Sequence, residues 1–156
     1  MKSPKHLYFV GIAGTGMAST AGLMKQAGYN VSGSDQQVYP PMSTLLENLK
    51  IPVCSPYQVE NIEKSSADLY VIGNSLSVKN PEVDYILQKN LPYTSFPALL
   101  GETFLKDKTS LVVVGTHGKT TTTSLVAHCL KEAGCDPGYM IGGLPKNLSS
   151  GFHFSP

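Results

Sequence analysis

Short apolar segments alternate with helical segments along most of this chain, and this alternation restricts the possible fold more than any other feature. Parallel strands of one sheet need long crossover connections, which are usually helical and right-handed. The alternation therefore predicts an α/β fold with a Rossmann-like, mostly parallel sheet whose two faces are covered by helices. The expected strands are residues 7–12, 29–33, 52–54, 69–72, 92–94 and 111–114.

Signals for helix starts and ends lie between these strands. Gly28 is placed to end a helix, because glycine readily adopts the left-handed conformation of the C′ position. Thr44 and Glu47 form a capping-box pattern, and Pro81 suits the first turn of another helix. The expected helices cover residues 17–27, 44–50, 81–90 and 97–104, and a fifth follows residue 118.

The C-terminal part of the chain allows two further structural predictions. The fifth helix has an apolar face that we expect to be buried, with Cys129 serving as core packing; the face comprises Leu125, Val126, Cys129, Leu130 and Ala133. Residues 149–156 show no periodicity, and we expect this tail to be mobile.

A glycine-rich loop follows the last apolar segment. Residues 115–121 read Gly-Thr-His-Gly-Lys-Thr-Thr and open a helix, as in a nucleoside-triphosphate cradle. Lys119 could reach the β- and γ-phosphates as the catalytic cation, and the Thr120 hydroxyl could bind Mg²⁺. The predicted ATP-binding residues are Gly115, Thr116, His117, Gly118, Lys119, Thr120 and Thr121.

This loop departs from the generic phosphate-loop pattern. That pattern would place its first glycine at position 113, where this chain has Val113; Gly115 begins a tighter variant. The alternative interpretation is a glycine-rich turn carrying a surface lysine. His117 could shape the loop or contact phosphate, or it could simply fill the space between two glycines.

A second glycine loop, Gly11–Met17, follows the first predicted strand and opens the first helix. Its order is Gly-x-x-Gly-x-Gly, in the context where a pyrophosphate meets a helix N-terminus. Asp35 follows the second strand, where an acidic side chain commonly accepts hydrogen bonds from a ribose. We therefore expect a diphosphate-bearing ligand here, although a tight turn with an exposed carboxylate would share the pattern. The predicted contacts are Gly14, Thr15, Gly16, Met17, Ser34, Asp35 and Asn74.

The organisation predicted for the chain is a Rossmann-like domain followed by the start of a P-loop ATPase domain. Residues 1–106 contain a complete alternating pattern, and a polar patch at 106–108 precedes the final loop. Residues 107–156 offer too few elements to bury a separate core.

The net charge of +1, without a basic block, argues against a nucleic-acid partner. Three cysteines without a Cys-x-x-Cys pattern favour a reduced cytoplasmic compartment.

The loop sequences resemble those of a known family. Gly-Thr-His-Gly-Lys-Thr-Thr after a valine-rich strand resembles the ATP loop of the muramyl (Mur) amino-acid ligases of peptidoglycan synthesis. Gly-Ile-Ala-Gly-Thr-Gly-Met and Gly-Ser-Asp resemble the UDP-binding domain of the members that use UDP-N-acetylmuramate. Residues 38–44, 71–74 and 141–147 are similar to the members that ligate a murein peptide.

The resemblance implies an ATP- and Mg²⁺-dependent cytoplasmic ligase of bacterial peptidoglycan recycling. Such an enzyme joins UDP-N-acetylmuramate to L-alanyl-γ-D-glutamyl-meso-diaminopimelate through an acyl phosphate. It further implies that the first loop and Asp35 hold UDP and that Lys119 stabilises the transferred phosphoryl group. Because the family has three domains, this chain is expected to be an N-terminal fragment that is inactive alone.

Three alternatives remain open. Gly16-Met17-Ala18 is closer to the ligases that add L-alanine to UDP-N-acetylmuramate than to the peptide ligases. The chain could also be a non-catalytic module that binds a UDP-sugar. Finally, the first glycine loop could serve a dinucleotide-dependent oxidoreductase, which binding of NAD in preference to UDP would indicate.

Overall fold

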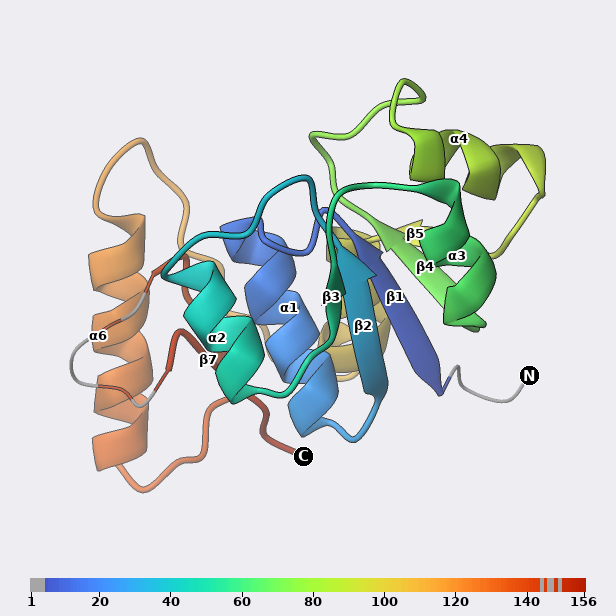
Figure 1. Cartoon of the computed structure of the whole chain (residues 1–156). Coiled ribbons are helices and arrows are strands. Elements are labelled where there is room, and N and C mark those ends of the chain that lie inside the picture. Colours follow the sequence, from blue (N-terminus) through green and yellow to red (C-terminus); the bar gives the residue numbers. More distant parts are fainter. Residues whose placement is uncertain (1–4, 144, 146–147, 149) are drawn as a thin grey trace.

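The computed structural model describes residues 5–143, 145, 148 and 150–156. Its main sheet has five parallel strands in the order β3-β2-β1-β4-β5, which confirms the predicted α/β fold (Figure 1). The strands are β1 His6–Val10, β2 Asn30–Ser34, β3 Val53–Cys54, β4 Leu69–Ile72 and β5 Tyr93–Ser95. The strand order reverses direction between β1 and β4, so the carboxyl ends of these two strands form a topological switch point.

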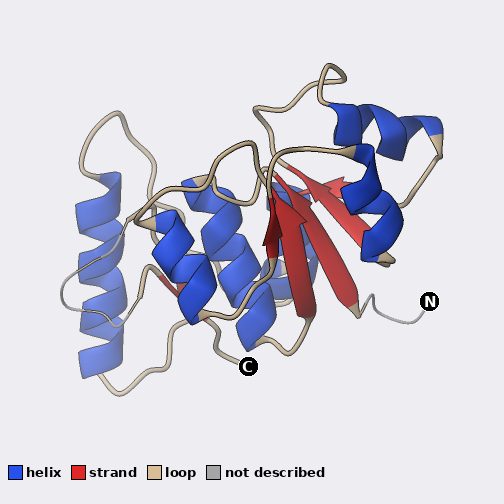
Figure 2. Cartoon of the chain, viewed as in Figure 1, coloured by secondary structure: helices blue, strands red, loops and turns tan. Residues whose placement is uncertain are grey.

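Helices cover both faces of this sheet (Figure 2). They are α1 Thr15–Gln26, α2 Met42–Asn48, α3 Val59–Ser65, α4 Pro81–Gln88 and α5 Phe96–Leu100, which continues into a π-helix, η1 Gly101–Leu105. The C-terminal part contains α6 Lys119–Glu132 and a short antiparallel pair, β6 Tyr139–Met140 and β7 Phe152–His153. No helix among the described residues is sufficiently long and apolar to cross a bilayer.

Alternating side chains of β1 supply two cores. Leu7 and Phe9 are buried in the core that includes residues of α1, α2 and α5, whereas Tyr8 and Val10 are buried in the core that includes residues of α3 and α4. This is the two-sided burial expected of a central parallel strand. The sheet is thereby fixed between two helical layers, and its carboxyl edge is a rigid base for loops.

The helix-end predictions had different outcomes. Gly28 adopts φ +91° just after α1, and Pro81 begins α4, both as predicted. The capping box at Thr44 is wrong, because α2 begins at Met42 after Pro41 and no side chain caps it. Thr44 therefore lies inside the helix, and its hydroxyl has no free first-turn amide at the expected place.

The predicted buried strand at residues 111–114 is wrong. This segment has no regular structure, and Leu111, Val112 and Val114 are 68%, 75% and 82% exposed. A strand needs a neighbour to bond with, and within the described part of the chain β6 and β7 pair only with each other. The segment has the apolar sequence of a buried strand, but no strand of the described residues pairs with it.

The apolar face of α6 is also largely uncovered. Leu125 is 59% exposed and Cys129 is exposed, so the prediction that Cys129 is core packing is wrong. Ala127 is the residue of this helix that is buried, in a small cluster with Ile141 and Leu148. Periodicity correctly identified the helix, but an apolar face is buried only where another element packs against it.

Residues 150–156 of the tail are held by packing, which corrects the expectation that they are mobile; Ser149 lies outside the described residues. Phe152 in β7 is 1% exposed, and its ring lies over Gly22 in the middle of α1, where an added Cβ would be 2.1 Å from the ring. The Phe154 amide donates to Oε1 of Gln26 at 2.9 Å, and its ring lies 5.6 Å from that of Phe104. These contacts are long-range, and sequence periodicity carries no information about them.

Candidate functional site

The first glycine loop lies at the switch point of the sheet, between β1 and α1 (Figure 1). Gly11 adopts φ +84°, and its amide donates to the Ser34 carbonyl oxygen at 2.9 Å. The Ile12 amide donates to the same oxygen at 3.0 Å. Because both amides bond to the end of β2, the loop is fastened to the neighbouring strand before it turns into the helix.

Asp35 fastens the loop a second time. Its Oδ2 accepts a hydrogen bond from the Ala13 amide at 2.8 Å, and its Oδ1 accepts from the Gln36 amide at 2.8 Å and from the Tyr57 hydroxyl at 3.2 Å. Burial, with the Asp35 carboxylate nearby, raises the pKa of Tyr57, so this phenol stays a proton donor at neutral pH. Asp35 is therefore close to the loop, as predicted, but it also has a structural role there.

The glycines of the loop region differ in what their backbone requires. Gly33, beside the loop, is needed for close packing, because a Cβ there would lie 2.4 Å from the Phe9 carbonyl oxygen. Gly14 has φ −63° and ψ 139°, which any residue adopts, and its nearest contact would be 3.6 Å. A Cβ added to Gly16 would lie 3.4 Å from the Phe96 ring. The fold itself therefore does not require glycine at position 14, which leaves close approach of a ligand as a reason for it.

The start of α1 is open to an anion. No side chain caps this helix, and its first turn contains no acidic residue. By contrast, the Asn80 side chain accepts hydrogen bonds from the Glu82 and Val83 amides and closes the start of α4. The free amides of the first turn and the helix dipole favour a negatively charged group at α1.

The predicted residues of this site divide into exposed and buried ones. Gly14, Thr15 and Asn74 are exposed, with Asn74 two residues after the end of β4, on the other side of the switch point. Met17 is 4% exposed, so only its backbone can face a ligand. Ser34 is fully buried and its hydroxyl donates to Glu82, so the side chain of this predicted contact residue does not face a ligand.

The second loop, residues 115–121, is exposed along its whole length. Gly115 and Gly118 have φ values of +153° and +77°, so the loop uses conformations that favour glycine. The Lys119 ammonium donates to the Gly115 carbonyl oxygen at 2.7 Å and to that of Thr116 at 3.3 Å. The lysine thus closes the loop on itself with two of the three N–H donors of its ammonium, which leaves one for a phosphate.

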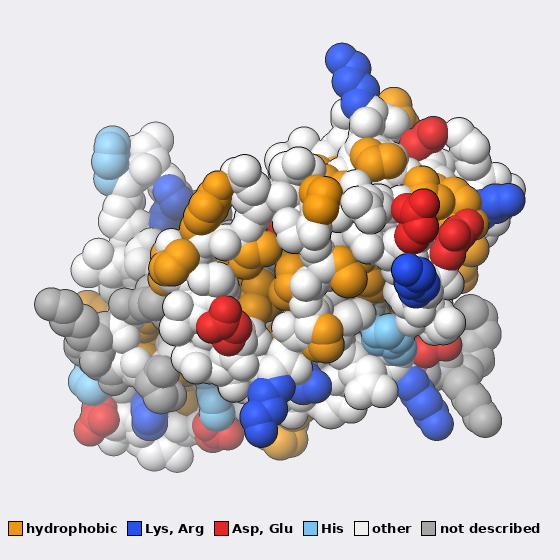
Figure 3. Space-filling model, viewed as in Figure 1, with side chains coloured by type: hydrophobic (Ala, Val, Ile, Leu, Met, Phe, Trp, Pro, Cys, Tyr) orange, Lys and Arg blue, Asp and Glu red, His pale blue; other side chains and the backbone are white. Residues whose placement is uncertain are grey.

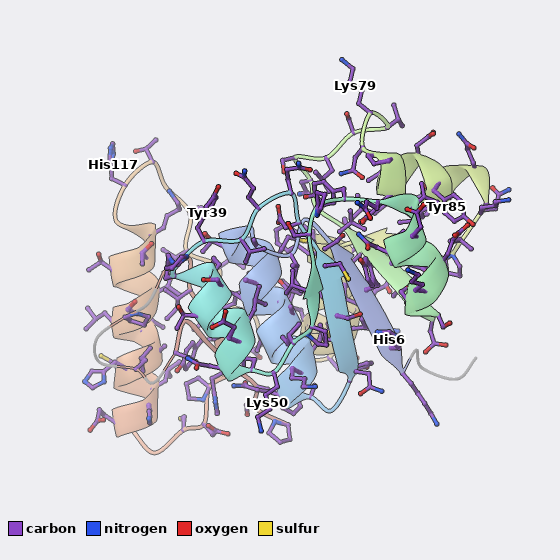
Figure 4. The ribbon with its side chains drawn as sticks, viewed as in Figure 1. His6, Tyr39, Lys50, Lys79, Tyr85 and His117 are labelled. Atoms are coloured by element: carbon purple, nitrogen blue, oxygen red, sulfur yellow. The ribbon has the colours of Figure 1, made fainter. Side chains whose placement is uncertain are left out.

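The remaining residues of the second loop are placed for solvent or ligand contact. His117 projects away from the fold at the tip of the loop (Figure 4), where its Nδ1 lies 3.2 Å from the Thr116 hydroxyl. Thr120 and Thr121 are exposed in the first turn of α6, which has no side-chain cap and no acidic residue. The described residues contain no group of three or more His, Cys, Asp or Glu side chains suited to a metal. Thr120 fits one position of a Mg²⁺ site, and the phosphates of a nucleotide would supply others.

One short segment contacts both loop regions. The Met140 methyl would lie 3.9 Å from a Cβ on Gly16, and its sulfur accepts a hydrogen bond from Thr20 at 3.8 Å. Three residues later, a Cβ on Gly143 would lie 3.3 Å from the methyl group of Thr120. In Figure 1, α1 and α6 both begin at the upper side of the molecule, where the β-strands also end. The two helix N-termini therefore face the same side.

Several residues around the first loop were not predicted from the sequence. Tyr57 binds Asp35, Phe96 and Met140 border Gly16, and Glu82 binds Ser34. No local pattern distinguishes these residues, since they reach the loop from α4, α5, β6 and the segment between β3 and α3. The surface shown in Figure 3 has Lys side chains interspersed with acidic ones and no continuous basic stripe on this face.

The comparison with protein families decides the assignment. The model described as "Mur ligase family, catalytic domain" matches residues 6–108, well over half of the chain.

The chain belongs to the Mur ligase family.

Individual Mur ligases resemble it closely. A UDP-N-acetylmuramate–L-alanyl-γ-D-glutamyl-meso-2,6-diaminoheptandioate ligase of Haemophilus influenzae is 44% identical over 144 residues, which are 92% of this chain and 32% of that protein. A UDP-N-acetylmuramate–L-alanine ligase of a Psychrobacter species is 39% identical over 143 residues, 92% of this chain and 29% of that protein. The chain thus spans about a third of the length of these curated relatives.

A solved Mur ligase structure has the same fold. The crystal structure of UDP-N-acetylmuramate:L-alanyl-γ-D-glutamyl-meso-diaminopimelate ligase from Neisseria meningitides superposes with a TM-score of 0.92 at 44% identity. The match covers 96% of this chain and 46% of that chain. The α/β architecture described above is therefore that of this region of the Mur ligases.

Proposed function

We propose that this chain carries the UDP-N-acetylmuramate site and the ATP loop of a bacterial ligase that makes an amide bond during peptidoglycan recycling. The observation that carries this proposal is the pair of glycine loops that open uncapped helices on one side of the molecule. Two such helix starts suit two phosphorylated substrates. Membership of the Mur ligase family supports the identity of both.

The first loop would hold the UDP part of the substrate. The amides of Thr15, Gly16 and Met17 belong to the first turn of α1 and have no intrahelical acceptor, so they can bind the pyrophosphate. Asp35 and Asn74 lie on either side of the switch point, where they could contact the uridine. Gly14 keeps the approach free of a side chain.

The second loop would hold ATP. The amides of residues 115–121 would surround the β-phosphate, while the Lys119 ammonium, which donates to two loop carbonyls, would give its remaining N–H donor to the transferring phosphoryl group. Thr120 would supply a hydroxyl ligand to Mg²⁺, which neutralises charge on the phosphates when it is bound. Lys119 is thus the proposed catalytic residue of this chain.

The proposed reaction has two steps. The lactyl carboxylate of UDP-N-acetylmuramate attacks the γ-phosphorus of ATP, forming an acyl phosphate and releasing ADP. The peptide amine then attacks the acyl carbon, the amide bond forms, and inorganic phosphate leaves. Lys119 stabilises the negative charge of the phosphoryl group during the first step. ATP and a UDP-sugar are cytoplasmic metabolites, and the three free, exposed cysteines suit the same compartment.

We further propose that residues 1–106 form the UDP-sugar domain and that residues 107–156 begin the ATPase domain. Residues 111–113 line a cavity of about 670 Å³ that α6 and α5 also line. This cavity and the apolar residue Leu125 would be covered by further strands and helices of the longer protein. Strands parallel to residues 111–114 would give this segment the pairing it lacks.

The amine substrate is proposed to be L-alanyl-γ-D-glutamyl-meso-diaminopimelate. A protein at 44% identity bears this name, while one at 39% is an L-alanine ligase. The test is ADP release by the full-length protein with UDP-N-acetylmuramate, ATP and Mg²⁺, comparing the tripeptide with L-alanine. Faster release with the tripeptide, abolished by Lys119→Ala, supports the proposal. Faster release with L-alanine overturns the choice of amine.

Ligand binding at the first loop and ADP release together distinguish the proposed ligase from two other functions. A dinucleotide oxidoreductase would bind NAD more tightly than UDP, whereas a ligase of this family would do the opposite. A non-catalytic UDP-sugar module would bind UDP-N-acetylmuramate, yet its full-length protein would release no ADP with any amine. Calorimetric titration with UDP and NAD, together with the ADP assay, distinguishes all three functions.

A further inference from the structure

Glu82 is a charged residue buried beneath the first loop's supporting strand. It lies in the first turn of α4 and is 0% exposed. Its Oε1 accepts hydrogen bonds from the Gln58 amide at 3.0 Å and the Asn61 side-chain amide at 2.7 Å, and its Oε2 accepts from the Ser34 hydroxyl. No lysine, arginine or histidine of the described chain forms an ion pair with it.

A buried carboxylate without a cationic partner is costly to keep. Burial of a charge disfavours folding unless hydrogen bonds replace the lost hydration, and an apolar residue of similar size would often be as stable. Glu82 is also not needed to cap its own helix, because Asn80 already accepts from the first-turn amides. Its neighbourhood contains another costly group, since the buried Tyr8 hydroxyl has no partner among the described residues. Stability alone therefore does not explain Glu82.

Ser34 connects Glu82 to the first loop. Its hydroxyl donates to Glu82, while its carbonyl oxygen accepts from the Gly11 and Ile12 amides at 2.9 and 3.0 Å. Glu82 thus holds the side chain of the residue whose carbonyl fixes the loop, while the Asp35 amide of the same peptide donates to the Cys54 carbonyl oxygen at 3.1 Å. The Asp35 carboxylate, which binds the Ala13 amide, belongs to the next residue.

We propose that Glu82 is a positioning residue that holds Ser34 and thereby directs the first-loop amides toward the diphosphate of the substrate. The identity of the ligand in this inference rests on the proposed function, whereas the effect of Glu82 on the first loop does not. Glu82 joins α3, α4 and the end of β2 to the switch point. If Glu82 positions the loop in this way, ligand binding at the first loop depends on a side chain that never contacts the ligand.

The test compares Glu82→Gln and Ser34→Ala, singly and together, with Glu63→Gln as an exposed control for the same substitution. Glutamine keeps one acceptor oxygen for Gln58 and Asn61 and presents an NH₂ group to Ser34, so the charged hydrogen bond from Ser34 is replaced by a neutral one in the reverse direction. Amide hydrogen exchange of Gly11 and Ile12 is measured by NMR without ligand, with the Leu7 and Phe9 amides as core references. UDP and Mg-ATP affinities are measured by calorimetry.

Glu82→Gln is expected to accelerate exchange at Gly11 and Ile12 by about tenfold, the scale of replacing a hydrogen bond to a charged group by one to a neutral group, with little change at Leu7 and Phe9. UDP affinity should fall by about the same factor while Mg-ATP affinity stays unchanged. In the Ser34→Ala background the Glu82 substitution should have little further effect, since its partner is absent. Glu63→Gln should resemble the parent.

Three results would overturn the inference. The first is unchanged exchange at Gly11 and Ile12 in Glu82→Gln. The second is uniform acceleration that includes Leu7 and Phe9, which would mean that Glu82 only stabilises the fold. The third is additive effects of the two substitutions. If the parent chain does not bind UDP, the proposed function fails, while the exchange measurements still decide whether Glu82 positions the loop.

Discussion

The two glycine loops of this chain have the same local design but very different support. The first is bonded to β2 through Ser34 and to Asp35 through Ala13, and it lies on a five-stranded sheet with two covered faces. The second follows an exposed segment without strand partners, and its lysine bonds to its own carbonyls. Each loop leads into a helix start with no side-chain cap.

This difference in support shows that a phosphate-loop sequence alone does not make a phosphate-binding site. Phosphate binding needs several amides held in one arrangement before the ligand arrives, since ordering them afterwards costs conformational entropy. In the first loop the sheet and Asp35 provide that arrangement within this chain. In the second loop the motif is complete, but the sheet that would hold it is not among the described residues. We therefore expect the first site to be preorganised and the second to be weak in this chain.

The largest expected effect is on stability. Gly33→Ala should lower the free energy of unfolding by about 3 kcal/mol, because its Cβ would lie 2.4 Å from the Phe9 carbonyl oxygen. Gly118→Ala meets no atom within 4 Å and should cost at most about 1 kcal/mol for its left-handed backbone. Urea unfolding measures both changes.

Gly28→Ala is the matched control for these two variants. Gly28 also has a positive φ with no atom within 4 Å, but it lies in the well-packed first region. The loss of unfolding free energy in Gly28→Ala therefore measures the cost of a positive φ at a residue other than glycine, without a steric clash. Similar losses for Gly33→Ala and Gly118→Ala would contradict the difference in support between the two loops.

The next effect is on binding at the first loop. Gly14→Val should weaken UDP-N-acetylmuramate binding by about tenfold or more, since a side chain would block approach to the helix start. Its melting temperature should stay close to that of the parent, because the Gly14 backbone suits any residue. Asp35→Ala should weaken binding similarly, but with some loss of stability from the freed Ala13 amide. If both variants fold and bind UDP as the parent does, the first site is wrongly assigned.

The smallest expected effect comes from Lys119→Ala. The side chain bonds only to carbonyls of its own exposed loop, so the free energy of unfolding should change by less than about 0.5 kcal/mol. UDP-N-acetylmuramate affinity should not change. Thermal unfolding and calorimetry check these two expectations. A marked loss of stability would show that the second loop is better integrated into the fold than its exposure indicates.

Sequence patterns predicted the first region better than the second for a physical reason. Strands and helices of the first region were recognised because their partners lie in the same segment of chain, as for Leu7 and Phe9 in β1. Residues 111–114 and Cys129 have the same apolar character, yet they stay largely exposed, because within the described residues no strand pairs with the segment and nothing covers Cys129. Phe152 shows the opposite case, in which a tail without periodicity is buried by one long-range contact with Gly22.

The candidate site was predictable to a similar extent. Glycine spacing located both loops, and strand ends located Asp35 and Asn74. The buried roles of Ser34 and Met17 could not be read from spacing, because the same positions suit a ligand or the core. Glu82 carried no signal at all, since it reaches the site through Ser34 from a helix far along the chain.

The most direct test of the account is a pair of calorimetric titrations of this chain, one with UDP-N-acetylmuramate and one with Mg-ATP. We expect saturable binding of UDP-N-acetylmuramate and at least about 100-fold weaker binding of ATP, a difference of about 2.7 kcal/mol. The same sample should release no ADP when both substrates and the tripeptide are present, because phosphoryl transfer depends on positioned charge. Equal affinities, or ADP release that Lys119→Ala abolishes, would contradict the claim that only the first loop is preorganised in this chain.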